Sequence, residues 1–157
     1  VKVYIWHCDA RGYYSGFLKY NPDEPAPPVE KADPSDPSRF LRGVQTTNNA
    51  GKVSFETIYP GFYYGRAIHI HIEVYKGGNA VYVGQVYFPE DLNKKLEQLD
   101  DYGDRRIKRT LNKDDSIFTG SGGVDTTLKL KGDFSGFKTS IILGIDPRTI
   151  TKEKSEG

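Results

Sequence analysis

The sequence of 157 residues contains no methionine, one tryptophan, three histidines and one cysteine. With Cys8 alone, the chain lacks the cysteine cluster that holds many structural zinc ions. We expect Cys8 to be either a free, buried thiol or one half of a disulfide whose partner lies upstream of this sequence. The missing initiator methionine and the apolar opening, with Val1, Val3 and Ile5, predict a processed or truncated chain.

Positive and negative charges nearly balance, because the sequence has 22 Lys and Arg residues and 21 Asp and Glu residues, for a net charge of +1. Binding to phosphates needs a basic excess, so nucleic acid is not expected as a partner. The apolar runs also fall short of the roughly 18 residues that cross a bilayer, so no membrane partner is expected. The length fits one domain, residues 1–157, with a sizeable core.

Short segments rich in β-branched and aromatic residues, separated by Gly, Pro and Asn turns, follow one another along the chain. Strands are predicted at 1–7, 40–45, 53–58, 67–75, 80–88, 124–131 and 137–145, with hairpins joining the second to the third and the last two. One helix is predicted within 89–109, and the Pro-rich stretch 21–38 is expected to be an ordered loop. This pattern predicts an all-β sandwich of mostly antiparallel strands with long loops and one short helix.

Two of the three histidines, His69 and His71, lie two residues apart in a predicted strand. Residues i and i+2 share one face of a strand, so both imidazoles point the same way while Ile70 and Ile72 point into a core. Such a pair can reach one metal ion. Histidines that serve only as hydrogen-bonding groups are the alternative for this spacing.

The choice of metal depends on the remaining donors. Glu73 lies on the same face as the histidines, which leaves an Fe(II) or Cu(II) site with Glu73 as an alternative. Tyr63 and Tyr64 lie just upstream, between glycines that let the backbone bend. Phenolate is a hard anion, and a free phenol ionises near pH 10, so a strongly positive ion is needed to hold it at neutral pH. Phenol donors therefore favour a trivalent ion such as Fe(III).

The sequence resembles the intradiol ring-cleavage dioxygenases, the family of catechol and protocatechuate dioxygenases, over roughly its first 89 residues. The resemblance is carried by the order and spacing of several blocks: IWHCDA with GYYS (5–10 and 12–15), FLRGVQ (40–45), GKVSFETIYPGFY (51–63), RAIHIH (66–71) and QVYFP (85–89).

This resemblance implies Fe(III) bound by Tyr14, Tyr63, His69 and His71. Tyr14 stands in the Gly-x-Tyr-Ser motif and Tyr63 in the Pro-Gly-x-Tyr motif. Family members commonly have proline on both sides of the second tyrosine, whereas this chain has Phe62 and Tyr64, which makes Tyr64 an alternative ligand.

The resemblance also implies the reaction, in which O₂ cleaves a catechol between its two hydroxyl-bearing carbons to give a cis,cis-muconate-type diacid. Tyr63, as the ligand that leaves on substrate binding, would accept a substrate proton. Arg66 would stabilise negative charge on the ring, and Gln85 would hydrogen-bond beside Arg66. The WHCDA block (6–10) and the compact length are similar to a secreted branch of the family, so we expect a secreted protein, with a cytoplasmic enzyme as the alternative. We also expect a monomer or weak homo-oligomer.

The alternative function is a non-catalytic β-sandwich that binds carbohydrate or protein through exposed tyrosines. Outside the site, His7 is expected to be structural and Trp6 to belong to the core. The charged side chains of the predicted helical region are expected to form a solvated face: Lys94, Lys95, Arg105 and Arg106.

Overall fold

The computed structural model describes residues 1–26 and 33–149, and it is built around a four-stranded antiparallel sheet with the order β2-β1-β3-β4. The strands are β1 (Lys2–Trp6), β2 (Arg42–Thr46), β3 (His69–Lys76) and β4 (Asn79–Tyr87). A two-residue turn joins β3 to β4, and its glycines, Gly77 and Gly78, have positive φ values of 58° and 84°. Both φ values lie in the region that glycine adopts without steric cost.

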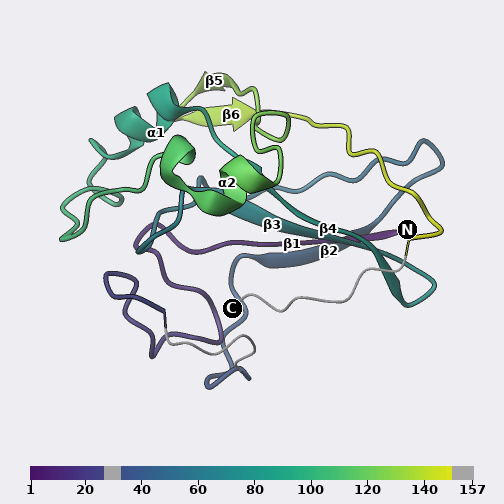
Figure 1. Cartoon of the computed structure of the whole chain (residues 1–157), viewed down its shortest axis with the longest axis horizontal. Coiled ribbons are helices and arrows are strands. Elements are labelled where there is room, and N and C mark those ends of the chain that lie inside the picture. The colour runs from purple at the N-terminus through teal and green to yellow at the C-terminus, as the bar shows by residue number, and fades with distance from the viewer. Residues whose placement is uncertain (27–32, 150–157) are drawn as a thin grey trace.

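The core lies on one face of this sheet. Ile70, Ile72 and Val74 of β3 are all buried in it, as the alternation of side chains along the strand predicts. The second layer comes from the C-terminal half of the chain, whose partly buried apolar residues pack on the same cluster: Leu130, Ile141, Leu143 and Ile145. The segment after β6 runs from the β5–β6 hairpin toward the N-terminus (Figure 1).

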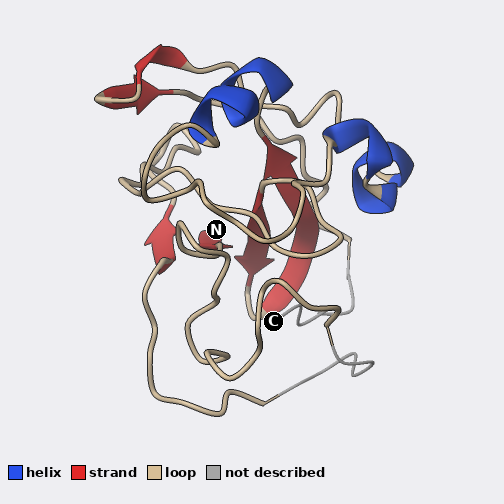
Figure 2. Cartoon of the chain, turned by 90° about the vertical axis from the view of Figure 1, so that its left-hand side faces the viewer, coloured by secondary structure: helices blue, strands red, loops and turns tan. Residues whose placement is uncertain are grey.

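Short elements complete the fold: α1 (Glu90–Leu96), a 3₁₀ turn η1 (Asn112–Asp114), α2 (Ser116–Gly120), β5 (Lys131–Asp133) and β6 (Gly136–Lys138). Figure 2 shows both α-helices toward the same end of the molecule. The all-β class with antiparallel strands is confirmed, and α1 lies where a helix was predicted. The sequence patterns did not predict η1 or α2. Within the described residues, no helix is long and apolar enough to cross a membrane.

Three predicted strands differ from the structure. Residues 53–58 are not a strand, although the ring of Phe55 packs close to Gly43 of β2. The predicted strands 124–131 and 137–145 enter the β5–β6 pair only at their facing ends, through Lys131 and through Phe137 and Lys138, and the rest of the pair lies in the predicted turn. Their alternation reflects burial without a continuous ladder, since Ile141 and Leu143 pack on the core while Ile142 between them is 96% exposed.

The prediction of a solvated charged face is wrong for Arg105. Its side chain is 3% exposed and forms an ion pair with Asp23 at 2.7 Å. The guanidinium also donates to the carbonyl of Phe62 at 2.7 Å and lies over the ring of Phe62. Arg105 therefore ties the loop after α1 to the segment that carries Tyr63.

Candidate active site

His69 and His71 project from β3 on the face opposite the core, and both are almost fully buried because loops cover this face. Their Nε2 atoms lie 3.2 Å apart. The Nδ1 atom of His69 lies 2.6 Å from the carbonyl oxygen of Ala67. A carbonyl can only accept, so Nδ1 carries the proton and Nε2 presents its lone pair to the cluster.

Two phenol oxygens meet these nitrogens. The Tyr14 hydroxyl lies 3.3 Å from Nε2 of His69 and 3.1 Å from Nε2 of His71. The Tyr63 hydroxyl lies 3.3 Å from Nε2 of His69 and 3.4 Å from the Tyr14 hydroxyl. Tyr14 comes from the loop after β1 and Tyr63 from the loop before β3. The structure thus brings together the four side chains that the sequence singled out.

The cluster includes Tyr63 and not its neighbour. Tyr64 is 49% exposed, so it does not belong to the buried group. The local backbone separates the two tyrosines: Tyr63 and Arg66 form an isolated antiparallel bridge, and Gly65 between them has φ +79°. This tight turn directs Tyr63 inward.

The donor set fits a metal ion. Five distances between these four donors are 3.1–3.4 Å. The centre of a tetrahedron with edges of this length lies about 2 Å from each corner, which is the length of metal–nitrogen and metal–oxygen bonds. Burial raises the pKa of Tyr14 well above its usual range, and the nearby Tyr63 raises it further. Burial also lowers the pKa of His69 to about 3 and that of His71 well below its usual value. The imidazoles are therefore neutral and could act as ligands, and a bound cation would supply the charge that ionises the phenols.

Glu73 does not complete a metal site with the histidines. Its carboxylate accepts a hydrogen bond from the Tyr75 hydroxyl at 2.9 Å. Within residues 1–26 and 33–149, no group of three His, Cys, Asp or Glu side chains is arranged to hold a metal ion. Glu73 therefore does not form such a group with the histidines among these residues, and the two phenol oxygens lie beside the histidine nitrogens.

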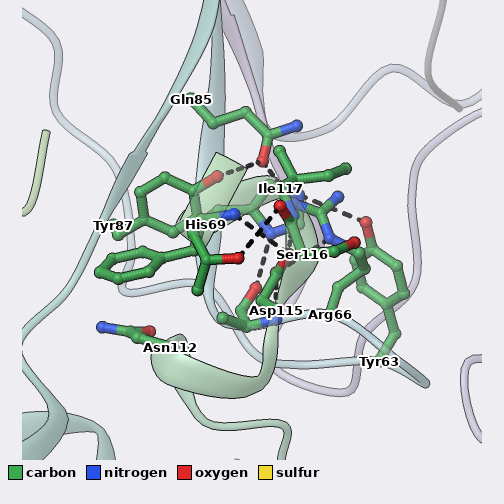
Figure 3. A network of polar contacts seen from close by, with 12 residues as sticks. Tyr63, Arg66, His69, Gln85, Tyr87, Asn112, Asp115, Ser116 and Ile117 are labelled. Carbon is green, nitrogen blue, oxygen red and sulfur yellow. Dashed lines mark hydrogen bonds and ion pairs between the residues drawn. The ribbon is translucent and has the colours of Figure 1, made fainter. Parts of the chain in front are cut away.

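Arg66 and Gln85 lie beside Tyr63 and His69 of the cluster, as Figure 3 shows. Arg66 donates through Nε to Asp115 at 3.0 Å and through a terminal nitrogen to the side-chain oxygen of Gln85. The same oxygen of Gln85 accepts from the Tyr87 hydroxyl at 3.1 Å. Gln85 is also the register partner of His71 across β3 and β4. The guanidinium is thus held between two elements at the edge of the buried cluster.

Comparison with solved structures identifies this arrangement. The intradiol ring-cleavage dioxygenase from Tetranychus urticae superposes with a TM-score of 0.87 and 37% identity, covering 96% of this chain and 73% of its own. A second solved structure, of a dioxygenase, gives the same values. The chain belongs to the intradiol ring-cleavage dioxygenases.

A more distant structure shares the fold. The dioxygenase domain of a fusion with a carbohydrate-binding protein from a cellulolytic Streptomyces has a TM-score of 0.53 and 20% identity, over 89% of this chain and 64% of its own. No protein family model matches the sequence, and no curated protein matches it. The expectation of an enzyme of this family is confirmed by the two structures at 37% identity.

The segments that carry the two tyrosines of the dioxygenase are joined to each other. His7 is buried between the carbonyl of Cys8 at 2.7 Å and the hydroxyl of Thr57 at 2.8 Å, which is a structural position outside the donor cluster. The Cys8 thiol is free and buried, and it donates to the carbonyl of Gly61 at 3.4 Å. The Gly61 amide donates to the carbonyl of Asp9 at 3.0 Å. These contacts fix the spacing between the two loops.

Sequence reasoning missed two contributors to the site of the dioxygenase. Trp6 was expected in the core, yet its ring stacks on His71 on the site face of the sheet. Asp115 is 1% exposed and holds Arg66, and no motif indicated it. The available signal for Asp115 was its suitability as an N-cap for a short helix, which gives no hint of a partner 49 residues away.

Proposed function

We propose that Tyr14, Tyr63, His69 and His71 bind Fe(III) and that the enzyme cleaves catechol-type diols with O₂ between the two hydroxyl-bearing carbons. The bond between those carbons breaks and each becomes a carboxyl carbon, so both atoms of O₂ enter a cis,cis-muconate-type diacid. The observation that supports this proposal best is the near-equal spacing of two phenol and two imidazole donors in one buried cluster.

The proposed charge state follows from the donors. Two ionised phenols and two neutral imidazoles offer two negative charges, which leaves a trivalent ion with one positive charge inside the protein. When bound, Fe(III) supplies a chelating centre for the deprotonated diol and withdraws electron density from the ring, which makes the ring reactive toward O₂.

The remaining roles belong to the protein side chains. Tyr63 lies closer to the surface than Tyr14, which is buried, and we assign to the Tyr63 oxygen the acceptance of a proton from the substrate diol. Arg66 presents a fixed cation to negative charge that develops on the ring, and such preorganised charge lowers the barrier in a buried site. Gln85 and Asp115 keep the guanidinium in place.

Colour tests the ligand set directly. Charge transfer from tyrosinate to Fe(III) should give the purified, iron-loaded enzyme a burgundy colour. Tyr14→Phe should bleach or blue-shift this band, because it removes one phenolate. A colourless protein with full iron occupancy would contradict the two-tyrosine site.

Oxygen uptake tests the reaction. We expect uptake with catechol or 4-methylcatechol, together with the ultraviolet absorbance of a muconate-type product. Protocatechuate and hydroxyquinol complete the panel and define the substrate. Products of cleavage outside the two hydroxyl-bearing carbons would overturn the assignment.

A further inference from the structure

We propose that Asp115 is a positioning residue for the reaction, because its carboxylate fixes the Arg66 guanidinium and, through the Ala67 peptide, the His69 imidazole. The inference rests on the proposed function of the site. It concerns a residue that no sequence motif indicated and that touches none of the four donor atoms.

Both oxygens of the buried Asp115 carboxylate are occupied. One oxygen, Oδ2, accepts from Nε of Arg66 at 3.0 Å and from the amide of Ala67 at 2.8 Å. The other, Oδ1, accepts from the amides of Ile117 at 2.8 Å and Phe118 at 3.3 Å, which caps α2. A carboxylate that accepts four hydrogen bonds has a fixed plane, so it holds each of its hydrogen-bond partners in a fixed position.

The first arm of this network ends at Arg66. Its Nε is held by Asp115 and one terminal nitrogen by Gln85, so the guanidinium is fixed along two directions. The side chain of Arg66 is 16% exposed, which leaves it at the margin of the buried cluster. An arginine confined in this way needs little reorganisation when negative charge develops beside it.

The second arm ends at His69. The Ala67 peptide is held at its amide by Asp115 and accepts at its carbonyl from Nδ1 of His69 at 2.6 Å. Hydrogen bonds of this kind select the tautomer of a ligating histidine and fix its ring, and their loss costs about 10- to 100-fold in metal affinity or activity. Asp115 thus supports a proposed metal ligand and the proposed charge-stabilising residue together.

A purely structural role, the capping of α2, is the competing explanation, and substitution can separate it. Asn and Ser are both favourable N-cap residues, so Asp115→Asn and Asp115→Ser retain a cap for α2. Neither offers Arg66 and Ala67 a charged oxygen. Asp114→Asn is the matched control, because Asp114 is the exposed neighbour and carries the same charge.

The first measurement needs no iron. In ¹⁵N–¹H spectra of the metal-free protein, Nε–H of Arg66 should give a resonance protected from exchange, assigned by its loss in Arg66→Lys. The resonance should persist in Asp114→Asn and disappear in both Asp115 variants. Persistence in the Asp115 variants would overturn the positioning of Arg66.

The second measurement is kinetic. On catechol, with rates normalised to bound iron, the Asp115 variants should lower kcat about 10- to 100-fold while KM changes by less than about threefold. Chelator competition should give weaker iron binding than in Asp114→Asn. In the double variant Asp115→Asn with Arg66→Lys, the loss of kcat should be smaller than the product of the single losses.

These outcomes separate a failure of the inference about Asp115 from a failure of the proposed function. Wild-type kcat in the Asp115 variants, or losses that multiply in the double variant, would overturn the inference while leaving the proposed function intact. A wild-type protein that binds iron without cleaving any catechol would defeat the proposed function. In that case the Arg66 resonance and the iron affinity would still decide whether Asp115 positions Arg66 and His69.

Discussion

The indole of Trp6 lies flat on the imidazole of His71, with ring centroids 4.8 Å apart and ring planes 1° apart. The two residues are register partners in the adjacent strands β1 and β3. A side chain that packs on the flat face of an imidazole restricts its rotation, as the partners of ligating histidines do. Trp6 is therefore a second support for the proposed iron site, independent of Asp115.

Replacing the indole tests this support. Trp6→Leu should weaken iron binding by about tenfold, because the aliphatic side chain leaves the His71 ring free to tilt. Trp6→Phe keeps a flat ring and is the matched control, with a smaller loss expected. Competition with a chelator at fixed pH measures the affinity. Equal affinities in the Leu and Phe variants would show that the stack does not orient His71.

The sheet that carries the site could be predicted from the sequence because its pattern is local. Alternation placed His69 and His71 on one face of β3 and Ile70 and Ile72 on the other, and the structure has this arrangement. The same rule was wrong for residues 53–58. Alternate side chains of a segment can be partly buried, as those of Val53 and Phe55 are, without the segment pairing with a neighbouring strand.

The surroundings of the site could not be predicted in this way. Asp115 reaches Arg66 across 49 residues, and Arg105 reaches Asp23 across 82. A charged residue has the same appearance in the sequence whether it is solvated or buried against a partner. Only the packing of the loop after α1 against the tyrosine segments buries Arg105, and no periodic pattern encodes that contact.

Gly61 is required where the two tyrosine segments meet. A Cβ atom at this position would overlap the carbonyl oxygens of Asp9 and Ala10. We expect Gly61→Ala to lower the free energy of unfolding by about 1–3 kcal/mol, as overpacking does in a tight contact. It should also shift the proposed tyrosinate band, since the loops of both tyrosines must move apart.

The control for this substitution is Gly144→Ala. Gly144 is exposed, and a Cβ atom there would meet nothing within 4 Å. Urea unfolding of the metal-free proteins measures stability, and the visible spectrum of the iron-loaded proteins measures the site. A Gly61→Ala variant as stable as Gly144→Ala, with an unchanged spectrum, would contradict the close contact between the loops.

The adjacent tyrosines provide a matched pair of variants. Tyr63→Phe removes the hydroxyl that lies 3.3 Å from His69, so it should change the visible band and lower kcat about 10²- to 10⁴-fold, the range for loss of a proton-transfer group. Tyr64→Phe removes the hydroxyl of a half-exposed residue and should leave both unchanged. The reverse pattern would assign the second phenolate to Tyr64.

The buried Cys8 thiol makes the stability of the enzyme decrease at alkaline pH. Burial, assisted by the charge of Asp9, raises the pKa of the Cys8 thiol from 9.0 to about 12. At pH 8 and below, the thiol is almost fully protonated in both the folded and unfolded states, so its full contribution is present. Between these two pKa values the unfolded chain loses the proton first, and the free energy of unfolding therefore falls as pH rises.

Comparison with Cys8→Ala isolates this effect. Between pH 8 and about pH 10.5, wild type should lose about 1–2 kcal/mol more stability in urea unfolding than Cys8→Ala does. Tyr102, whose pKa burial also raises to about 12, is present in both proteins and so contributes to both. The native thiol should resist a thiol reagent at pH 8 and react after unfolding, because the thiolate is the nucleophile. The prediction fails if the free energy of unfolding has the same pH dependence in the two proteins, or if the native enzyme is modified rapidly. Either result would mean that Cys8 ionises as an exposed thiol does and that its contact with Gly61 is not maintained in solution.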